Sequence, residues 1–377
     1  MADHEQRVTP LELFFDLVFV FAITQVTGLL AADPTWQGLG RGVLVLAALW
    51  WSWAAYAWLT NTTNPDEGIV RLAMLAAGAA MLVVSLAVPE AFGDHGVLFA
   101  VAYLFVRVLH LAVYALAGRG DRDLLGAVLS ITPTAIVGPG MIAVAGFLEG
   151  APRISLWVLA LALDYLGPLV SRGRGWHLSP AHFAERHGLI LIIALGESIV
   201  ALGVGAAGEP LDPGLIAAAL LGIAAVAALW WAYFDVAALL AQRALSARSG
   251  APQARLARDA YSYLHLPLVA GIVLFALGLK KTLDHTGDPL AAVPAAALFG
   301  GLALYLLAHV AFKLRTTRLL SLPRLVAAAA LVAVAPVGTE VDALASLTLA
   351  AAVMCALVAF ETVRFGETRR EVRLAAE

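Results

Sequence analysis

The chain has 377 residues, of which 61% are hydrophobic and only 14% are charged, and its mean hydropathy is +0.86. A soluble domain usually carries about 25% charged residues, so the composition excludes a soluble protein and predicts an all-α integral membrane protein. The net charge of −3 argues against a nucleic-acid partner, and a single cysteine, Cys355, excludes a disulfide framework.

Twelve apolar segments are long enough to cross about 30 Å of hydrocarbon as helices. They lie at residues 11–31, 39–59, 69–89, 96–117, 124–148, 154–171, 184–205, 213–240, 261–283, 291–313, 319–337 and 342–364. The fifth segment contains Pro133 and the run Gly138-Pro139-Gly140, which we expect to break or kink its helix.

The basic residues predict the orientation of these segments. Of the 24 Lys and Arg residues, 18 fall at the termini or near the even-numbered loops, and 4 fall near the odd-numbered loops. The remaining two, Arg107 and Arg324, lie within expected spans. Cytoplasmic loops carry the excess of Lys and Arg, so the bias predicts that both termini lie in the cytoplasm.

Short matches between the two halves of the chain indicate an internal duplication. The sequence AALWW occurs at 47–51 and again at 227–231, and VLHLAVY around His110 resembles LAHVAFK around His309. Their order is consistent with an offset of six spans, and an even offset gives the halves parallel topology. We therefore expect two parallel six-helix repeats, at residues 1–180 and 181–377.

Glu12 and Asp16 are the first ionisable residues inside an apolar segment. They lie one helical turn apart, so both side chains point the same way, and a carboxylate in hydrocarbon costs roughly 3 kcal/mol. Glu12 could instead reach the membrane interface. Asp16, one turn deeper, should be buried and paired, and its simplest partner is Arg107, which shares a helix face with His110.

Further polar residues follow in later segments, and the predicted topology puts most of them in the cytoplasmic half of the membrane. Glu197 lies near mid-span and is a functional candidate by position, whereas His309 and Trp231 have a simpler interpretation as packed core residues. Glu185 and His187 do not share a helix face, so they make a poor metal site. We predict one polar cavity, or two related ones, and the candidate residues are Glu12, Phe15, Asp16, Arg107, His110, Asp164, Glu185, Arg186, His187, Glu197, Trp231, Asp235 and His309.

Three motifs resemble the bacterial low temperature requirement protein A family: TPLELFFDLVFVFAI at 9–23, FAERHGLILIIALGESIVALG at 183–203 and WWAYFD at 230–235. The resemblance implies a multi-pass inner-membrane protein whose biochemical activity is poorly defined. The family motifs fall on Glu12, Phe14, Phe15, Asp16, Glu185, Arg186, His187, Gly188, Gly196, Glu197 and Asp235.

Three functions are compatible with these residues. A cation- or proton-coupled transporter or channel would use Asp16 and Glu197 to bind the ion, with Arg107 and His110 tuning them. An intramembrane enzyme would act on a lipid or isoprenoid substrate by acid–base chemistry, or would hold Mg²⁺ against a diphosphate. A sensor or scaffold would need no turnover. The sequence contains no Walker loop and no dinucleotide fingerprint, so no cofactor is predicted.

Overall fold

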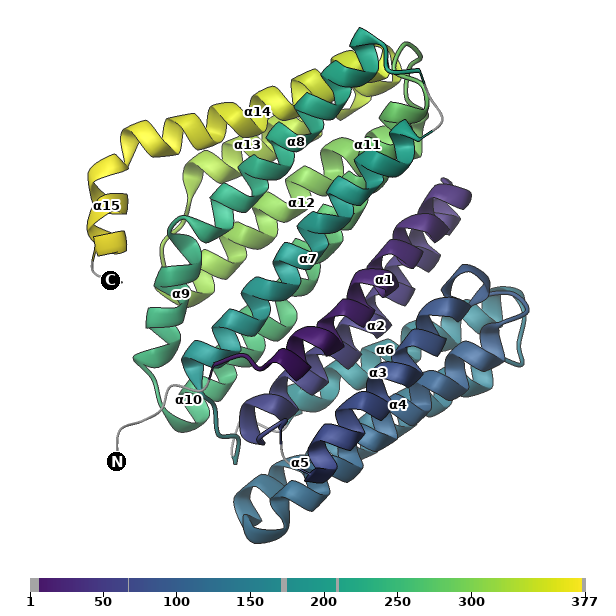
Figure 1. The fold of residues 1–377 in the computed structure, drawn as a ribbon, viewed down its shortest axis with the longest axis vertical. Helices are drawn as coiled ribbons and strands as arrows, with labels where there is room; N and C mark the ends of the chain where they lie inside the picture. The colour runs from purple at the N-terminus through teal and green to yellow at the C-terminus, as the bar shows by residue number, and fades with distance from the viewer. Residues whose placement is uncertain (1–6, 67, 171–174, 208–209, 375–377) are drawn as a thin grey trace. The chain divides into compact units, whose positions relative to one another are not determined.

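The computed structural model describes residues 7–66, 68–170, 175–207 and 210–374. Within these residues nearly the whole chain is helical, and the β structure is limited to an isolated bridge between Pro289 and Asp342. Long helices run side by side in each part of the chain (Figure 1). The prediction of an all-α fold is confirmed.

The helices alternate with short connections along the chain. In the first half they are α1 Pro10–Ala32, α2 Trp36–Thr62, α3 Gly68–Ala87, η1 Val88–Glu90, α4 Gly96–Ala117, η2 Gly118–Gly120, α5 Arg122–Ala145 and α6 Gly150–Val170. In the second half they are α7 Pro180–Ala206, α8 Pro213–Phe234, α9 Ala237–Ser246, α10 Gly250–Leu256, the π-helix η3 Ala257–Tyr263, α11 His265–Asp284, α12 Ala292–Thr317, α13 Leu322–Val334, η4 Ala335–Thr339, α14 Ala343–Arg364 and α15 Gly366–Leu374.

Eleven helices of the described chain are long and apolar enough to cross a membrane. The sixth expected segment forms the 21-residue helix α6 but is not among these eleven. The expected break in the fifth segment is absent, because α5 continues through Pro133 and Pro139 to Ala145. The freed backbone of such prolines is tolerated where neighbouring groups or local adjustments satisfy it.

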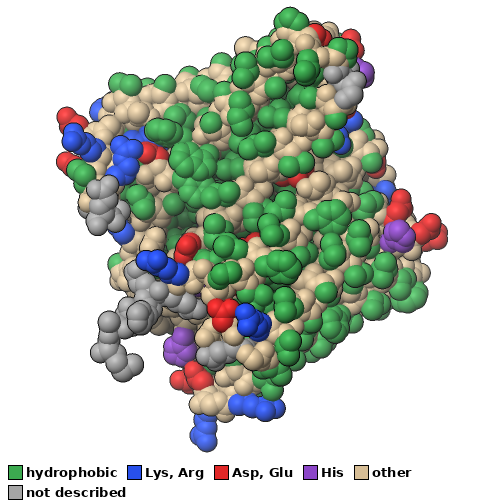
Figure 2. Space-filling model, viewed as in Figure 1, with side chains coloured by type: hydrophobic (Ala, Val, Ile, Leu, Met, Phe, Trp, Pro, Cys, Tyr) green, Lys and Arg blue, Asp and Glu red, His purple; other side chains and the backbone are tan. Residues whose placement is uncertain are grey.

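Large apolar side chains are exposed along the helices, as lipid contact requires. Leu17, Leu72, Leu159, Leu220 and Val326 are each more than half exposed. In the space-filling view hydrophobic side chains cover most of the visible surface, and most charged side chains lie at its margins (Figure 2). The exposed apolar surface and the eleven long apolar helices identify a polytopic membrane protein.

Aspartates begin several of the helices. Asp121, Asp212 and Asp342 each precede a helix, and each accepts a hydrogen bond from a backbone N–H of the first turn. Asp side chains are preferred at this position because they satisfy N–H groups that lack a helical partner. At Asp121, which lies outside the spans, the N–H groups of Leu124 and Asp123 lower the pKa of the carboxyl group below its ordinary value.

The chain divides into two compact units. Unit 1 comprises residues 1–29, 40–186 and 245–262, and unit 2 comprises residues 30–39, 187–244 and 263–377. Within unit 1, α3 packs on α4, α4 on α5, and α5 on α6. Within unit 2, α11 packs on α12, α12 on α13, and α8 on α14.

Helices α11 and α12 approach closely because glycines lie where they meet. A Cβ atom at Gly271 would lie 2.6 Å from the carbonyl oxygen of Gly301, and one at Gly301 would lie 2.6 Å from the nitrogen of Phe275. A Cβ atom at Gly278 would likewise lie 2.6 Å from the Cα of Leu298. Membrane helices associate through such close packing of small residues, since lipid supplies no hydrophobic driving force between them.

We expect Gly301→Ala to lower the free energy of unfolding by about 1–3 kcal/mol, because the new methyl group must push α11 and α12 apart. The neighbouring Gly300→Ala is the matched control, since a Cβ atom there meets nothing within 4 Å. Alanine in a helix is more favourable than glycine by up to about 1 kcal/mol, so the control should be neutral or slightly stabilising. Thermal unfolding in detergent measures both variants, and equal unfolding midpoints would contradict the packing argument.

Candidate functional site

Helix α1 begins with a capping box. Thr9 precedes the helix and Glu12 is its third residue. Glu12 Oε2 accepts hydrogen bonds from the backbone N–H of Thr9 at 2.9 Å and from its hydroxyl at 3.2 Å, while Thr9 Oγ1 accepts the N–H of Glu12 at 3.4 Å. Such reciprocal bonds satisfy N–H groups that no helical carbonyl reaches. Glu12 is fully buried, so the alternative in which it reaches the membrane interface is wrong.

The two carboxylates of α1 face two side chains of α7, and we call Glu12, Asp16, His182 and Arg186 the α1–α7 charge cluster. Arg186 Nη2 donates to Asp16 Oδ1 at 2.9 Å, and Arg186 Nη1 lies 3.3 Å from Glu12 Oε1. His182 Nε2 lies 3.1 Å from Glu12 Oε2. Each helix contributes residues four apart, which share one face. All four are at most 1% exposed, and the prediction that Asp16 is buried and paired is confirmed.

Asn61 fixes the protonation of His182. The backbone N–H of Ser179 donates to Asn61 Oδ1 at 2.8 Å, so the amide nitrogen of Asn61 faces His182 Nδ1, at 2.9 Å, as a donor. Nδ1 must then accept, which leaves Nε2 as the N–H that donates to Glu12. His182 is therefore neutral. With both carboxylates ionised, the α1–α7 charge cluster holds two negative charges and one positive charge.

The excess negative charge lies nearest Asp16. Asp16 Oδ1 accepts hydrogen bonds from Arg186 and from the indole Nε1 of Trp53, both at 2.9 Å. The guanidinium of Arg186 also lies 5.8 Å from the centre of the Trp53 ring, within cation–π range. Asp16 Oδ2 has no hydrogen-bond partner among the described residues. One oxygen of this carboxylate therefore accepts two hydrogen bonds, and the other accepts none from the described residues.

Arg107 pairs with Asp164, not with Asp16. Arg107 Nη2, on α4, lies 2.8 Å from Asp164 Oδ1, on α6, and both side chains are at least 96% buried. The predicted pair of Asp16 with Arg107 is wrong, because Arg186 supplies the cation for Asp16. Hydrophobic periodicity shows which side chains share a helix face, but it does not show which helices are neighbours.

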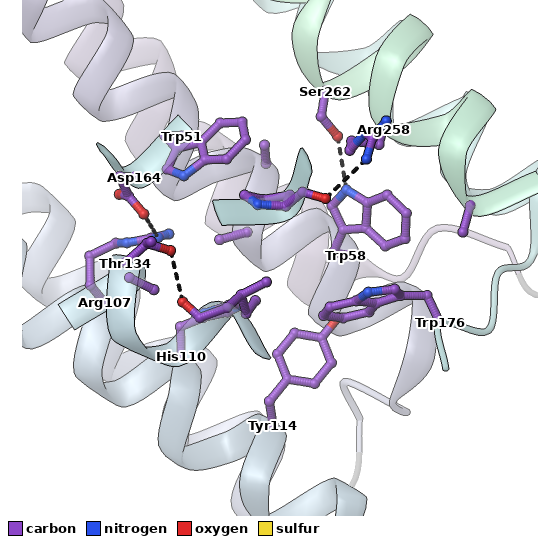
Figure 3. Close-up of a pocket in the computed structure, with 16 residues that line it drawn as sticks. Trp51, Trp58, Arg107, His110, Tyr114, Thr134, Asp164, Trp176, Arg258 and Ser262 are labelled. Carbon is purple, nitrogen blue, oxygen red and sulfur yellow. Dashed lines mark hydrogen bonds and ion pairs between the residues drawn. The ribbon is translucent and has the colours of Figure 1, made fainter. Parts of the chain in front are cut away.

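A cavity of about 70 Å³ lies inside unit 1, and we call it the unit 1 cavity. Its wall combines tryptophans from α2 and the chain before α7 with polar groups from α4, α6 and η3 (Figure 3). The lining residues are Trp51, Ala54, Ala55, Trp58, Arg107, His110, Tyr114, Ile131, Thr134, Ala135, Asp164, Pro168, Trp176, Ala254, Arg258 and Ser262.

Three buried side chains of the unit 1 cavity, those of Arg107, His110 and Asp164, keep polar atoms without a hydrogen-bond partner among the described residues, and in Asp164 this atom is Oδ2. Arg107 Nε and Nη1 have no hydrogen-bond partner among the described residues, although the side chain is nearly inaccessible. Neither ring nitrogen of His110 forms a regular hydrogen bond there, although the backbone of Ala55 lies close enough to interact with the ring. Buried donors without partners are costly and uncommon in folded proteins.

Aromatic contacts hold the rings of the unit 1 cavity in place. Trp51 stacks on Tyr165 with ring centres 4.0 Å apart, and Trp58 packs against Trp176 at 5.6 Å. Tyr114 packs edge-on against both His110, at 5.0 Å, and Trp176. Trp58, Tyr114 and Trp176 lie together at one side of the cavity, while Trp51 lies beside the Arg107–Asp164 pair at the other (Figure 3).

Unit 2 contains a separate buried ion pair. Arg324 binds Glu361 with two hydrogen bonds of 2.8 Å, and it also donates to His309 and to the backbone oxygen of Ala232. Two parallel bonds of this kind are the strongest geometry for an arginine and a carboxylate. His309 is fully buried and hydrogen-bonded, which agrees with the simpler of its two interpretations.

Asp235 binds the C-terminal helix. Arg369 Nε lies 2.6 Å from Asp235 Oδ2, and Arg373 Nη1 lies 2.7 Å from Asp235 Oδ1. Both arginines belong to α15, which turns sharply away from α14 (Figure 1). The two bonds use both carboxylate oxygens of Asp235, so this residue ties the end of α8 to α15.

The other predicted residues of α7 and α8 are dispersed. Glu185 is exposed and accepts a long hydrogen bond of 3.4 Å from the N–H of Val8. His187 is buried with its ring 5.2 Å from that of His265, and Glu197 is buried at 3% exposure. Trp231 is half-buried. No group of three or more His, Cys, Asp or Glu side chains in the described chain is placed to hold a metal ion.

The predicted residues therefore form several groups. Arg107, His110 and Asp164 meet at the unit 1 cavity. Glu12, Asp16 and Arg186 are not among its lining residues, so the candidates for one polar cavity, or two related ones, do not all meet at this cavity. Phe15 is buried at 2% exposure and packs on Tyr56, with ring centres 5.1 Å apart. Glu197, Trp231, Asp235 and His309 belong to unit 2.

Sequence reasoning missed His182 and Trp53, and only His182, one turn before the predicted Arg186, left a signal. His182 and Arg186 repeat the four-residue spacing of Glu12 and Asp16, so a basic face on α7 complementary to the acidic face of α1 was readable. The capping box around Glu12 could also have been predicted from the sequence, because Thr9 stands three residues before Glu12 and Pro10 follows it. Trp53 gave no signal, because a tryptophan in an apolar helix is most simply a packing residue.

Together these features define a class: a polytopic helical membrane protein whose interior charges are held in buried ion pairs. The chain belongs to the bacterial low temperature requirement A (LtrA) family, whose model matches residues 7–359. An uncharacterized protein of Rhizobium meliloti (strain 1021) is 32% identical over 289 residues, which cover 73% of this chain and 69% of that protein. No solved structure matches the chain.

We expect Arg186→Gln to destabilise the protein by about 3–5 kcal/mol, because it leaves the two carboxylates of the α1–α7 charge cluster buried without their cation. The control is Glu185→Gln at the adjacent, exposed position, where the change should stay within about 0.5 kcal/mol. Thermal unfolding of both variants in detergent tests this. Similar unfolding midpoints for the two variants would show that the Arg186 ion pairs do not support the fold.

Proposed function

We propose that this protein is a proton-coupled transporter of the bacterial inner membrane. The observation that carries the proposal is the unbalanced charge of the α1–α7 charge cluster. When both carboxylates are ionised they face one guanidinium, and the hydrogen bond from Asn61 leaves the neighbouring His182 neutral. An uncompensated charge away from water is costly, so the cluster favours the uptake of one positive charge. A proton on Asp16 would balance the cluster.

A proton suits this cluster better than a metal cation. Na⁺, K⁺ and Mg²⁺ need several oxygen ligands, and the described residues offer no cluster of carboxylates for them. Arg186 lies within 3.3 Å of both Glu12 and Asp16 and would repel a second cation. The unsatisfied Oδ2 atom of Asp16 is the free position for a proton.

Helix α2 gives the α1–α7 charge cluster a route to the unit 1 cavity. Trp53 donates to Asp16, while Trp51 and Trp58 of the same helix line the cavity. A second route runs through ring contacts from Phe15 to Tyr56, at 5.1 Å, and from Tyr56 to His110, at 5.4 Å. A change in the charge of Asp16 can therefore alter the positions of the cavity-lining side chains through rigid, packed groups.

The duplication remains part of this proposal, with twelve spans in repeats at residues 1–180 and 181–377. Each half contains a buried pair of an arginine and a carboxylate with a histidine of similar sequence context. The groups are Arg107, Asp164 and His110 in one half and Arg324, Glu361 and His309 in the other. Transporters are often built from two such repeats.

The Lys and Arg bias supports cytoplasmic termini. The unit 1 cavity is lined near the C-terminal ends of α2 and α4 and by Arg258, all on the side that carries most basic residues. We therefore orient this cavity toward the cytoplasm.

An intramembrane enzyme acting on a lipid or isoprenoid is the alternative function. The observation that favours it is His110, whose imidazole lines an aromatic cavity and could carry out acid–base chemistry. The same aromatic rings could pack against an apolar substrate. Turnover of such a substrate without proton movement across the membrane would favour the enzyme over the transporter.

Proton movement can be tested in liposomes that contain the purified protein and a trapped pH-sensitive dye. With an imposed K⁺ diffusion potential, we expect proton entry faster than in protein-free liposomes, and we expect Asp16→Asn to remove at least about nine-tenths of the increment. Asparagine keeps the bond from Trp53 and leaves Glu12 balanced by Arg186, so this variant should fold.

Glu185→Gln is the control and should retain the proton flux, because Glu185 is exposed and outside the cluster. Infrared spectra across a pH titration give a second measurement. The wild type and Glu185→Gln should share a protonated carboxyl band that Asp16→Asn lacks. Equal flux in the wild type and Asp16→Asn would overturn the role of Asp16.

A further inference from the structure

We infer that the unit 1 cavity is a binding site for a small amphipathic carboxylate, with its oxygens at Arg107 and His110 and its apolar body among the tryptophan rings. The inference concerns binding alone and goes beyond the transport proposal. It depends on the open donors, the charge balance, the wall and the size of the cavity.

The hydrogen-bond donors without a partner indicate the chemistry of the ligand's polar end. Arg107 uses only Nη2 in its bond to Asp164, and its Nε and Nη1 atoms have no partner among the described residues. The imidazole of His110, one turn along α4, supplies a further donor at the same wall. Charge-assisted bonds from a guanidinium to a carboxylate are roughly twice as strong as neutral ones. A ligand with anionic oxygens would therefore satisfy the most costly open groups.

The charge balance allows an anion beside Asp164. In the α1–α7 charge cluster one guanidinium, that of Arg186, already serves two carboxylates within 3.3 Å. Arg107 would serve Asp164 and the ligand in the same manner. Arg258 lies at another edge of the cavity, where it donates to the backbone oxygen of Pro168 and pairs with Asp259 at 2.7 Å, so its charge is already balanced.

The aromatic and small residues of the cavity wall indicate that the rest of the ligand is apolar. Trp51, Trp58 and Trp176 line the cavity together with small residues such as Ala54 and Ala135. Indole rings offer large flat apolar surfaces on which aromatic groups stack. An amine would find only Asp164 as its anionic partner among the lining residues; Oδ1 of that carboxylate is bonded to Arg107, and Oδ2 has no hydrogen-bond partner among the described residues.

The size of the cavity limits the ligand. One water molecule needs about 10–15 Å³ of such space, and the cavity holds about 70 Å³. A cavity that binds benzene measures about 150 Å³, so this volume suits the carboxylate head and the first few carbons of the ligand and is too small to enclose a ring. A ring or a longer chain would have to leave the cavity through its mouth.

Quenching of tryptophan fluorescence by a brominated probe tests the inference. The probe is 3-(4-bromophenyl)propionate, added to the full-length protein in phosphatidylcholine nanodiscs without a pH gradient. We expect saturable quenching that unbrominated 3-phenylpropionate competes away. The matched amide and amine should bind at least about tenfold more weakly. Equal binding by the amide would overturn the assignment of a carboxylate head.

Two variants locate the probe. The double variant Arg107→Gln/Asp164→Asn removes the cation but keeps a neutral hydrogen-bonding pair, and it should weaken binding at least about tenfold. Ala135→Phe fills the cavity without changing its charges and should also weaken binding. Glu185→Gln, at an exposed position outside the cavity lining and the α1–α7 charge cluster, is the control and should bind normally. Unchanged binding in both cavity variants would place the probe elsewhere and overturn the inference.

Discussion

The absence of water around a buried charge is the constraint on which this structure depends. An arginine or carboxylate in hydrocarbon must find a partner, because no solvent replaces its hydration. Arg107, Arg186 and Arg324 all lie in apolar helices, and each meets a carboxylate from a different helix. These pairs select which helices can be neighbours, while the apolar surface only requires that helices pack together. Specificity in this fold therefore comes from its few charges.

The same constraint separates structural pairs from candidate functional groups. Arg324 and Glu361 satisfy each other with two short bonds, and His309 adds a third contact. Such a fully hydrogen-bonded group gains little free energy from binding a proton or a ligand. The α1–α7 charge cluster is one positive charge short, and Arg107 keeps open donors beside a cavity. A buried group that is incompletely satisfied is where a proton or a ligand gains the most free energy.

Most of the fold was predictable from the sequence, because membrane helices are read from the length and apolarity of single segments. The burial and pairing of Asp16 followed from the cost of its charge. The partner of Asp16 did not follow, since helix periodicity orders side chains around one helix and gives no information on which helix lies next to it. The unit 1 cavity was beyond prediction for the same reason, as it depends on the shapes of rings such as Trp51 and Trp176.

The order of synthesis gives the α1–α7 charge cluster a role in biogenesis. The cation for Asp16 is Arg186, which lies 170 residues later in the chain. Five further long helices, α2 to α6, leave the ribosome before α7 does. Helix α1 therefore enters the bilayer with Asp16 either protonated or held at the surface, and the arrival of α7 lets the carboxylate ionise inside the protein. Completion of α7 is the step that fixes α1 in its final place.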